Sequence, residues 1–240
     1  MTRIDPGQPA RDTSVHAHGH GHGHGHGRSR GAQLCISYTK VNPLMDTRHP
    51  LRSVTGGLEG AVLEVLAGTT EVLPLKDVHA LVATASKSGV RKTLLRLVEN
   101  GVVDAAPGGY RLNRDHLACD AIVELAQLRS TLYSKIAAEI KRWKATIAVA
   151  GVFGSVARKD GDANSDIDVL VVGEKIPDGA IGALAQKVER WTGNTCHIVV
   201  LTKKELRSAQ RRGEPIVKSW RRDLVVLCGD RSTLTTTSVG

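Results

Sequence analysis

The sequence predicts an α+β fold with two folded parts, a long linking helix and polar ends. Three observations support this prediction. Apolar residues recur at helical spacing and then form a hairpin pattern within residues 54–114, a stripe with steps of three and four continues through residues 115–144, and valine-rich segments typical of buried strands occur within residues 145–230. We therefore expect a small helical domain, one linking helix or two in series, and a small mixed-sheet domain. Residues 1–53 and 231–240 are expected to be disordered.

The length and charge of the chain limit the class of protein to which it can belong. Its 240 residues are enough for two compact cores, and 33 Lys and Arg residues against 24 Asp and Glu residues give a formal charge of +9. A basic protein encounters polyanions readily, so a nucleic acid or a nucleotide is the first partner to consider. Many soluble proteins are simply basic, however, so the placement of the charges has to decide.

The cysteines and the hydropathy of the chain indicate a cytoplasmic protein. Cys35, Cys119, Cys196 and Cys228 are scattered and form no CxxC pair, which is unlike a disulfide scaffold or a zinc site. No apolar run approaches the ~20 residues needed to span a bilayer, and the polar N-terminal region lacks the apolar core of a signal peptide. We expect no membrane partner.

The N-terminal region carries the run "HAHGHGHGHGHG", which has no apolar periodicity. Its alternating histidines have the chemistry to chelate nickel or zinc, and an engineered purification tag is an equally good interpretation. The run contributes nothing to the fold prediction.

Residues 54–114 predict three short helices and a hairpin. Leu58, Val62 and Leu66 recur at helical spacing, and a second helix is expected over residues 75–82. The stretch "VVDAAPGGYRL" then reads as two short strands around a reversing turn.

The third helix, in "SKSGVRKTLLRLVENG", combines a buried stripe with a basic exposed face. Val90, Leu94 and Leu97 form the stripe. The predicted nucleic-acid-binding residues on the rest of the surface are Lys87, Arg91 and Lys92. Three helices followed by a hairpin resemble a winged helix-turn-helix, which implies that the third helix enters the major groove of DNA. Such units also serve as dimerisation or docking modules, and the basic residues are equally consistent with a solvated face.

A persistent apolar stripe follows from Asp115, a plausible helix N-cap. Because the side chains of such a stripe must be buried against another surface, the helix links the two domains or forms the interface of a homodimer. Its members are Leu117, Ala121, Leu125, Leu128, Leu132, Ile136 and Ile140.

The stretch "TIAVAGVFGS" predicts a buried strand that ends in a tight turn at Gly154 and Ser155. Glycine lets the backbone approach a ligand closely. If a short helix starts at Ser155, its free N–H groups and the serine hydroxyl would face a phosphate, with Arg158 as a further contact.

The stretch "SDIDVLVV" places Asp166 and Asp168 on one face of the next strand, with Ile167 in the core between them. Two carboxylates on one face repel each other unless a cation lies between them. Hard oxygen ligands favour Mg²⁺ or Mn²⁺, and Mg²⁺ typically completes its shell with substrate phosphates. The sequence therefore predicts a metal site beside a phosphate site.

The pattern G-S-x10-D-x-D resembles the polymerase-beta-like nucleotidyltransferase superfamily, in its minimal branch. The resemblance implies that Asp166 and Asp168 are catalytic metal ligands for Mg²⁺ or Mn²⁺. It also implies transfer of a nucleotidyl group from an NTP to a hydroxyl of an RNA, a protein or a small molecule, and such proteins often belong to toxin–antitoxin pairs. The implied nucleotide-binding residues are Gly154, Ser155, Arg158 and Ser165.

This chain departs from the family pattern in its next core strand, "TCHIVVL". The family usually supplies a third carboxylate there, whereas Cys196 and His197 stand in its place. Glu205 or Asp223 are the candidate replacements. The family also often has Ala-Arg-Gly after the serine, where this chain has Lys159 in place of the glycine.

The departures leave two functions open. The first is a metal-dependent nucleotidyltransferase, whose RNA acceptor would bind the basic run "KKELRSAQRRGEPIVKSWRRD" unless that run is only a solvated helical face. The alternative is a DNA-binding transcriptional regulator whose second domain has lost catalysis and serves as a nucleotide sensor or a dimerisation module.

Overall fold

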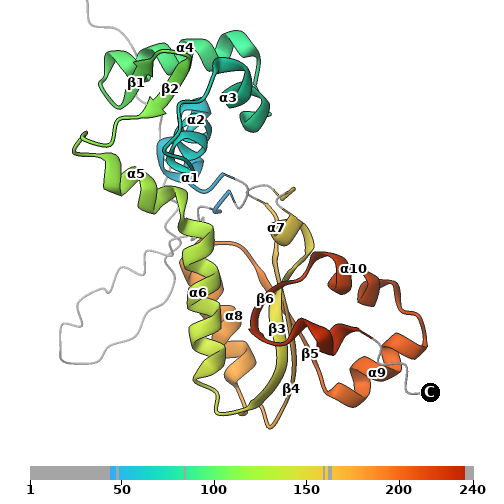
Figure 1. Ribbon diagram of the computed structural model, residues 1–240. Coiled ribbons are helices and arrows are strands. Elements are labelled where there is room, and N and C mark those ends of the chain that lie inside the picture. Colours follow the sequence, from blue (N-terminus) through green and yellow to red (C-terminus); the bar gives the residue numbers. More distant parts are fainter. Residues whose placement is uncertain (1–43, 47–48, 84, 159, 162–163, 236–240) are drawn as a thin grey trace, which may run out of the picture. The chain divides into compact units, whose positions relative to one another are not determined.

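The structure is a computed structural model, and its described residues are 44–46, 49–83, 85–158, 160–161 and 164–235 (Figure 1). The histidine run lies outside them. Among the described residues, the chain forms a mixture of helices with one two-stranded and one four-stranded sheet. The predicted α+β class is confirmed at this level. Over the same residues, no helix combines the length and the apolar character that crossing a membrane requires.

The N-terminal part consists of four helices and an antiparallel hairpin. The helix expected over residues 75–82 has those bounds, and the basic helix runs from Lys87 to Glu99. Ser86 caps the basic helix by accepting a hydrogen bond from the Gly89 N–H at 3.1 Å. The elements are α1 (Arg52–Thr55), α2 (Gly57–Ala67), α3 (Leu75–Val82), α4 (Lys87–Glu99), β1 (Val103–Ala106) and β2 (Gly109–Leu112).

One apolar core holds this part together. Val90, Leu94 and Leu97 of α4 are buried in it, as their spacing predicts. Leu51 is also fully buried there, and α1 begins at Arg52. Ordered structure therefore begins before residue 54, where the sequence places the end of a disordered tail.

The linking region forms two helices in series, α5 (Cys119–Ala126) and α6 (Leu128–Lys141), which meet at Gln127. The predicted stripe is confirmed in α6, where Leu132, Ile136 and Ile140 are buried. The predicted stripe is wrong at its beginning. Leu117 lies before α5 and is 100% exposed, and the buried residues of α5 are Cys119 and Ile122.

The predicted N-cap at Asp115 is also wrong, since α5 begins at Cys119. The Asn113 side chain accepts a hydrogen bond from the Asp115 N–H at 3.0 Å, and His116 Nδ1 accepts one from the Ala118 N–H at 3.1 Å. These local side-chain bonds stabilise a turn that competes with the first helical turn.

The C-terminal part is built on a four-stranded sheet with the order β5-β4-β3-β6. Strand β3 pairs antiparallel with β4 and β6, while β4 and β5 are parallel. Strand β6 closes one edge and was not predicted as a strand from the sequence. The elements are β3 (Thr146–Phe153), α7 (Gly154–Arg158), β4 (Ile167–Glu174), α8 (Ala180–Thr192), β5 (Cys196–Leu201), α9 (Lys203–Arg211), α10 (Pro215–Asp223) and β6 (Val225–Gly229).

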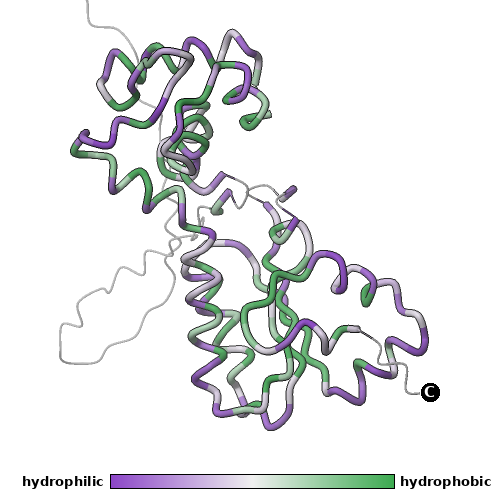
Figure 2. Tube along the Cα trace, in the orientation of Figure 1, coloured by the Kyte–Doolittle hydropathy of each residue, from purple (hydrophilic) through white to green (hydrophobic). Residues whose placement is uncertain are grey.

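Helices cover both faces of this sheet (Figure 1). Val169 and Val171 of β4 contribute to a core that includes α6 and α8, whereas Leu170 and Val172 contribute to a core that includes α9 and α10. Figure 2 shows the corresponding concentration of hydrophobic residues along the strands. Because side chains alternate along a strand, Asp168 belongs to the face that α9 and α10 cover.

The chain after β6 is ordered, which corrects the predicted disorder of its first residues. A 3₁₀-helix, η1 (Arg231–Leu234), follows the sheet, and Leu234 is buried beside α10. Arg231 donates hydrogen bonds to the carbonyl groups of Leu224 (2.7 Å), Arg221 (2.8 Å) and Arg222 (3.2 Å). These bonds satisfy carbonyl groups that the end of α10 leaves unpaired.

Candidate functional site

The turn between β3 and α7 lies directly against Asp168. Gly154 has φ +76°, a conformation that favours glycine, and a Cβ atom added there would collide with the Asp168 carboxylate. Phe153, the last residue of β3, is the register partner of Asp168. Glycine is therefore required at position 154 both by the backbone conformation and by the close approach of the carboxylate.

Asp166 immediately precedes β4 and Asp168 is the second residue of this strand, with Ile167 between them fully buried on the opposite face of the sheet. Burial raises the pKa of Asp168, and the neighbouring charge of Asp166 raises it further. His197 and Arg158 act in the opposite direction on the same pKa. The predicted pair of carboxylates is therefore brought together, with Asp168 partly buried and Asp166 exposed, and their two charges repel each other.

His197 occupies the place beside Asp168 in the parallel ladder of β4 and β5. Its Nδ1 lies 3.7 Å from Asp166 Oδ2 and 3.8 Å from Asp168 Oδ1. An imidazole therefore stands where the resemblance predicts a third carboxylate.

The donor set suits a divalent cation that shares its ligands with a substrate. Among the described residues, no group of three or more His, Cys, Asp or Glu side chains is arranged to hold a metal ion. Two adjacent carboxylates fit Mg²⁺ when water and phosphate oxygens complete the shell. The residues present thus fit a cation bound together with a phosphate compound.

Neither candidate replacement for the third acid faces this site as a free carboxylate. Glu205 accepts hydrogen bonds from the N–H and the hydroxyl of Thr202, at 2.7 and 2.8 Å, in the capping box of α9. Asp223 is paired with Arg222 and Arg158. Both carboxylates are therefore used by other interactions.

Arg158 lies at the end of α7, and its charge lowers the pKa of Asp168. Its Nε donates to Asp160 Oδ2 at 2.9 Å, and its Nη1 lies 3.5 Å from Asp223 Oδ2. Arg158 and Asp223 are 65 positions apart in the sequence, and no sequence motif predicts their contact.

Both predicted serines precede the carboxylates in the sequence, and Ser165 is adjacent to Asp166. The Ser155 carbonyl accepts hydrogen bonds from the N–H groups of Asp160 (3.2 Å) and Gly161 (3.3 Å), which closes the loop after α7. The Ser165 carbonyl accepts one from the Asn194 side chain at 3.1 Å. These bonds fix the backbone on both sides of the loop that connects the turn to Asp166.

The basic C-terminal run divides between two places. The first residue of α9, Lys203, comes two positions after Leu201, the last residue of β5, whereas His197 and Asp168 are the second residues of β5 and β4. In a parallel pair these are opposite ends of the sheet. Asp223, at the end of α10, pairs with Arg158, whose charge acts on Asp168. The groove expected beside the metal site therefore does not include the start of α9.

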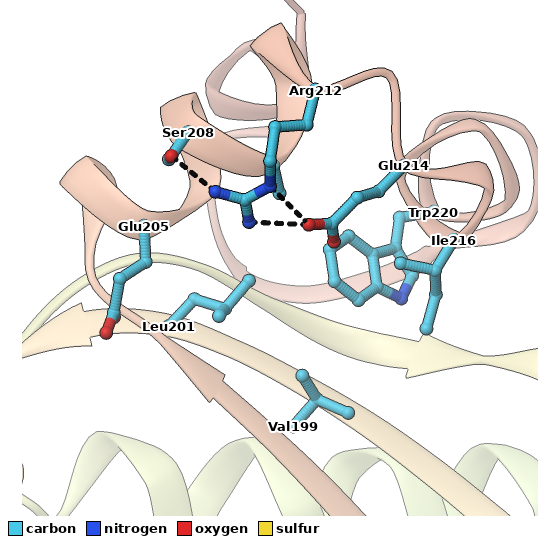
Figure 3. A pocket seen from close by; sticks show the side chains of 9 residues that line it. Val199, Leu201, Glu205, Ser208, Arg212, Glu214, Ile216 and Trp220 are labelled. Atoms are coloured by element: carbon cyan, nitrogen blue, oxygen red, sulfur yellow. Dashed lines mark hydrogen bonds and ion pairs between the residues drawn. The ribbon is translucent and has the colours of Figure 1, made fainter.

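A separate cavity of about 430 Å³ lies between β5, α9 and α10 (Figure 3). Val199, Leu201, Ile216 and Trp220 give it an apolar lining. Arg212 crosses its upper side and donates hydrogen bonds to Glu214 (2.9 Å) and Ser208 (2.7 Å). Arg212 and Glu214 of the lining are thus already paired with each other.

The three predicted nucleic-acid-binding residues, Lys87, Arg91 and Lys92, lie on α4 and not at the carboxylate site. All three are exposed. None of them forms an ion pair with another described residue, whereas Arg96 of the same helix is paired with Glu59.

The comparisons with known proteins concern the C-terminal part. Residues 133–225 match the family model of a nucleotidyltransferase domain. None of the curated proteins matches the chain. One similar solved structure, of the toxin–antitoxin with AMP-PNP, is 22% identical, covers 42% of this chain and 77% of its own, and has a TM-score of 0.33. Another, of a toxin–antitoxin MntA–HpeT mutant, is 20% identical, with corresponding coverages of 42% and 76% and a TM-score of 0.33.

The matched segment starts within α6, somewhat before the predicted domain boundary at residue 145, and ends at the start of β6. It contains the turn at Gly154 and both aspartates. Residues 133–225 are therefore similar to a nucleotidyltransferase domain, and Gly154, Ser155, Asp166 and Asp168 all lie within this matched segment.

Proposed function

We propose that the chain transfers a nucleotidyl group from an NTP to a hydroxyl of an RNA, such as a tRNA, or of a protein. One observation carries this proposal: within the segment similar to a nucleotidyltransferase domain, the Gly154 turn lies against Asp168, with Asp166 beside it. Phosphates that lie along this turn would come directly beside two carboxylates. Such a juxtaposition of phosphate oxygens and carboxylates is the ligand set that Mg²⁺ prefers.

In the proposed reaction, the acceptor oxygen forms a bond to the α-phosphorus, and the bond from that phosphorus to the oxygen bridging to the β-phosphate breaks. Pyrophosphate leaves with the electron pair, and the hydroxyl proton passes to solvent. Asp166 and Asp168 would hold Mg²⁺ or Mn²⁺, which neutralises phosphate charge and lowers the pKa of the attacking hydroxyl. Ser155, Ser165 and Arg158 bind and orient the nucleotide.

A second function is proposed for the N-terminal part, as a winged helix-turn-helix that contacts nucleic acid. The observation that favours it is the exposed basic face of α4, where Lys87, Arg91 and Lys92 form no ion pair with a described residue. Basic side chains that form no ion pair within the protein remain available to bind phosphate groups. In a transferase, this face would bind a nucleic-acid acceptor. In a DNA-binding regulator, it would bind DNA.

Calorimetric titration of the four NTPs with Mg²⁺ or Mn²⁺ tests the proposed transferase. We expect the unaltered chain to bind at least one NTP in a metal-dependent way and Asp166→Ala/Asp168→Ala to lose that binding. Asp178→Ala, which removes an exposed carboxylate outside the site, is the matched control and should bind normally. The histidine run is common to all three proteins, so its own metal binding cancels in the comparison. Absence of binding by the unaltered chain would exclude the proposed activity.

A further inference from the structure

Arg158 lies between two carboxylates of different character. Asp160 is 57% exposed and follows α7 in the connecting loop, whereas the side chain of Asp223 is only 6% exposed and belongs to α10. A partner on a loop that is open to solvent moves with the arginine, while a nearly buried partner on a packed helix holds it in place. Asp223 is therefore the partner that fixes the direction of the guanidinium.

Asp223 is itself held from several directions. Arg222 donates to Oδ1 through Nε at 2.7 Å and to Oδ2 through Nη2 at 2.8 Å, a two-point pairing with defined geometry. The Ser219 hydroxyl donates to Oδ2 at 3.4 Å. Arg222 and then Arg158 lower the pKa of Asp223, so this carboxylate remains ionised at neutral pH.

The helix that carries Asp223 is anchored at the carboxylate end of the sheet. Trp220 is buried, and its ring lies edge-on to Phe153 with the centroids 5.9 Å apart. Phe153 immediately precedes Gly154 and is the register partner of Asp168. Arg231 holds the other side of α10 by its bonds to the carbonyl groups of Arg221 and Arg222. The position of Asp223 relative to the turn and the aspartates is thus set by packed elements.

Arg158 keeps free donors in this arrangement. A guanidinium has five N–H donors, and among the described residues only Nε and Nη1 of Arg158 have partners. The 3.5 Å separation from Asp223 is long for a charge-assisted hydrogen bond, so this contact orients the arginine without saturating it. Nη2 remains available for a phosphate oxygen.

We infer that Asp223 is a positioning residue that holds Arg158 toward the triphosphate of the NTP, so that α10 contributes to substrate binding without touching the substrate. The inference rests on the proposed nucleotidyl transfer. Without Asp223, the long side chain of Arg158 samples many rotamers, and binding a phosphate then costs the entropy of ordering it. The effect should appear in the affinity for NTP more than in the rate of the bound complex.

The test measures NTP affinity by calorimetry, and KM and kcat once an acceptor is in hand, for Asp223→Asn, Arg158→Ala and the double variant. We expect each single substitution to raise the Kd and KM by about tenfold with kcat changed little, because the lost contact is made equally in the bound state and in the transition state. The double variant should be no worse than Arg158→Ala, because Asp223 acts only through that arginine. If the two effects multiply in the double variant, Asp223 acts by another route and the inference is wrong.

Three further variants separate positioning from charge and from folding. Asp160→Asn removes the exposed partner of Arg158 and should change the Kd less than twofold, while Asp178→Asn makes the same charge change outside the site and should change nothing. Asp223→Glu keeps the charge but displaces the carboxylate by one methylene, so it should raise the Kd even if Asp223→Asn unfolds. Normal affinity in a folded Asp223→Glu or Asp223→Asn overturns the inference alone, whereas no NTP binding by the unaltered chain overturns the proposed function with it.

Discussion

The two candidate functional surfaces of this protein are assembled in opposite ways. The basic face of α4 comes from one helix, in which Lys87, Arg91 and Lys92 lie within six consecutive residues and are not paired with other described residues. The carboxylate site comes from separate elements, because β4 supplies Asp168, β5 supplies His197 and α10 supplies Asp223.

This difference determines what each surface tolerates. A helix face depends on local periodicity, so losing one side chain leaves its neighbours in place. A site that joins several elements depends on their packing, and its charges shift each other's pKa. We therefore expect single substitutions at the carboxylate site to have large and coupled effects, and those on α4 to have small and additive ones.

The largest expected effect follows from removing either carboxylate. Asp166→Ala and Asp168→Ala should each lower metal-dependent nucleotide transfer by at least ~100-fold, since each would remove a ligand of the proposed cation. Transfer of a labelled nucleotide to total RNA or protein, with Asp178→Ala alongside, is the measurement. Transfer at the normal rate in either variant would show that the site lies elsewhere.

A methyl group on the turn should also disrupt the carboxylate site. Gly154→Ala places a Cβ against the Asp168 carboxylate and a side chain in a left-handed conformation, which costs about 1–2 kcal/mol for an ordinary residue. We expect a lower denaturant midpoint and weaker metal-dependent NTP binding together. Gly182→Ala is the matched control, because a Cβ atom there meets open space in α8. Equal behaviour of the two variants would argue against the close approach.

The basic face of α4 should respond more weakly. Arg91→Ala should weaken binding to a DNA duplex about tenfold and reduce the salt dependence by about one counterion, as expected for one phosphate contact. Arg96→Ala is the control on the same helix, because Arg96 is paired with Glu59. If both variants lose affinity for DNA to a similar extent, the effect comes from net charge and not from a specific contact. If Arg91→Ala binds DNA as tightly as the unaltered chain, α4 is not the interface.

The smallest effect concerns stability and pH. The pKa of Asp223 is lowered in the folded chain, so its pairing with Arg222 and Arg158 stabilises the fold above the pKa of an unfolded aspartate, about 3.9, and this contribution is lost as the pH falls through the folded pKa. Asp223→Asn should therefore lower the melting temperature by a few degrees at pH 7 and by less at pH 3. A difference that grows toward acid would contradict this pairing.

The sequence was most informative where a local pattern decides the structure. The spacing of Val90, Leu94 and Leu97 predicted the buried stripe of α4, and Gly154, Asp166 and Asp168 predicted a turn and two carboxylates that the fold brings together. Both depend on positions close in the chain, where periodicity and turn chemistry act directly.

It failed where distant or competing contacts decide. Leu117 fits the apolar period, yet hydrogen bonds of Asn113 and His116 replace the first helical turn. The third carboxylate was sought at Glu205 and Asp223, but one caps α9 and the other pairs with two arginines. The turn before α5 and the cap of α9 are local contacts that apolar periodicity does not report. The pairing of Asp223 with Arg158 leaves no trace in residue spacing, because it depends on the fold bringing α10 next to α7.

Arg231 shows why the boundaries of functional regions in this protein are easy to misplace. A shortened chain that ends at Gly229 would keep every strand of the four-stranded sheet, but it would lose the guanidinium that binds the end of α10 and the buried Leu234. The last turn of α10, which carries Asp223, would then fray. Removing the residues after the sheet would therefore weaken nucleotide affinity. Substrate recognition would then be assigned wrongly to a segment that only stabilises the end of a helix.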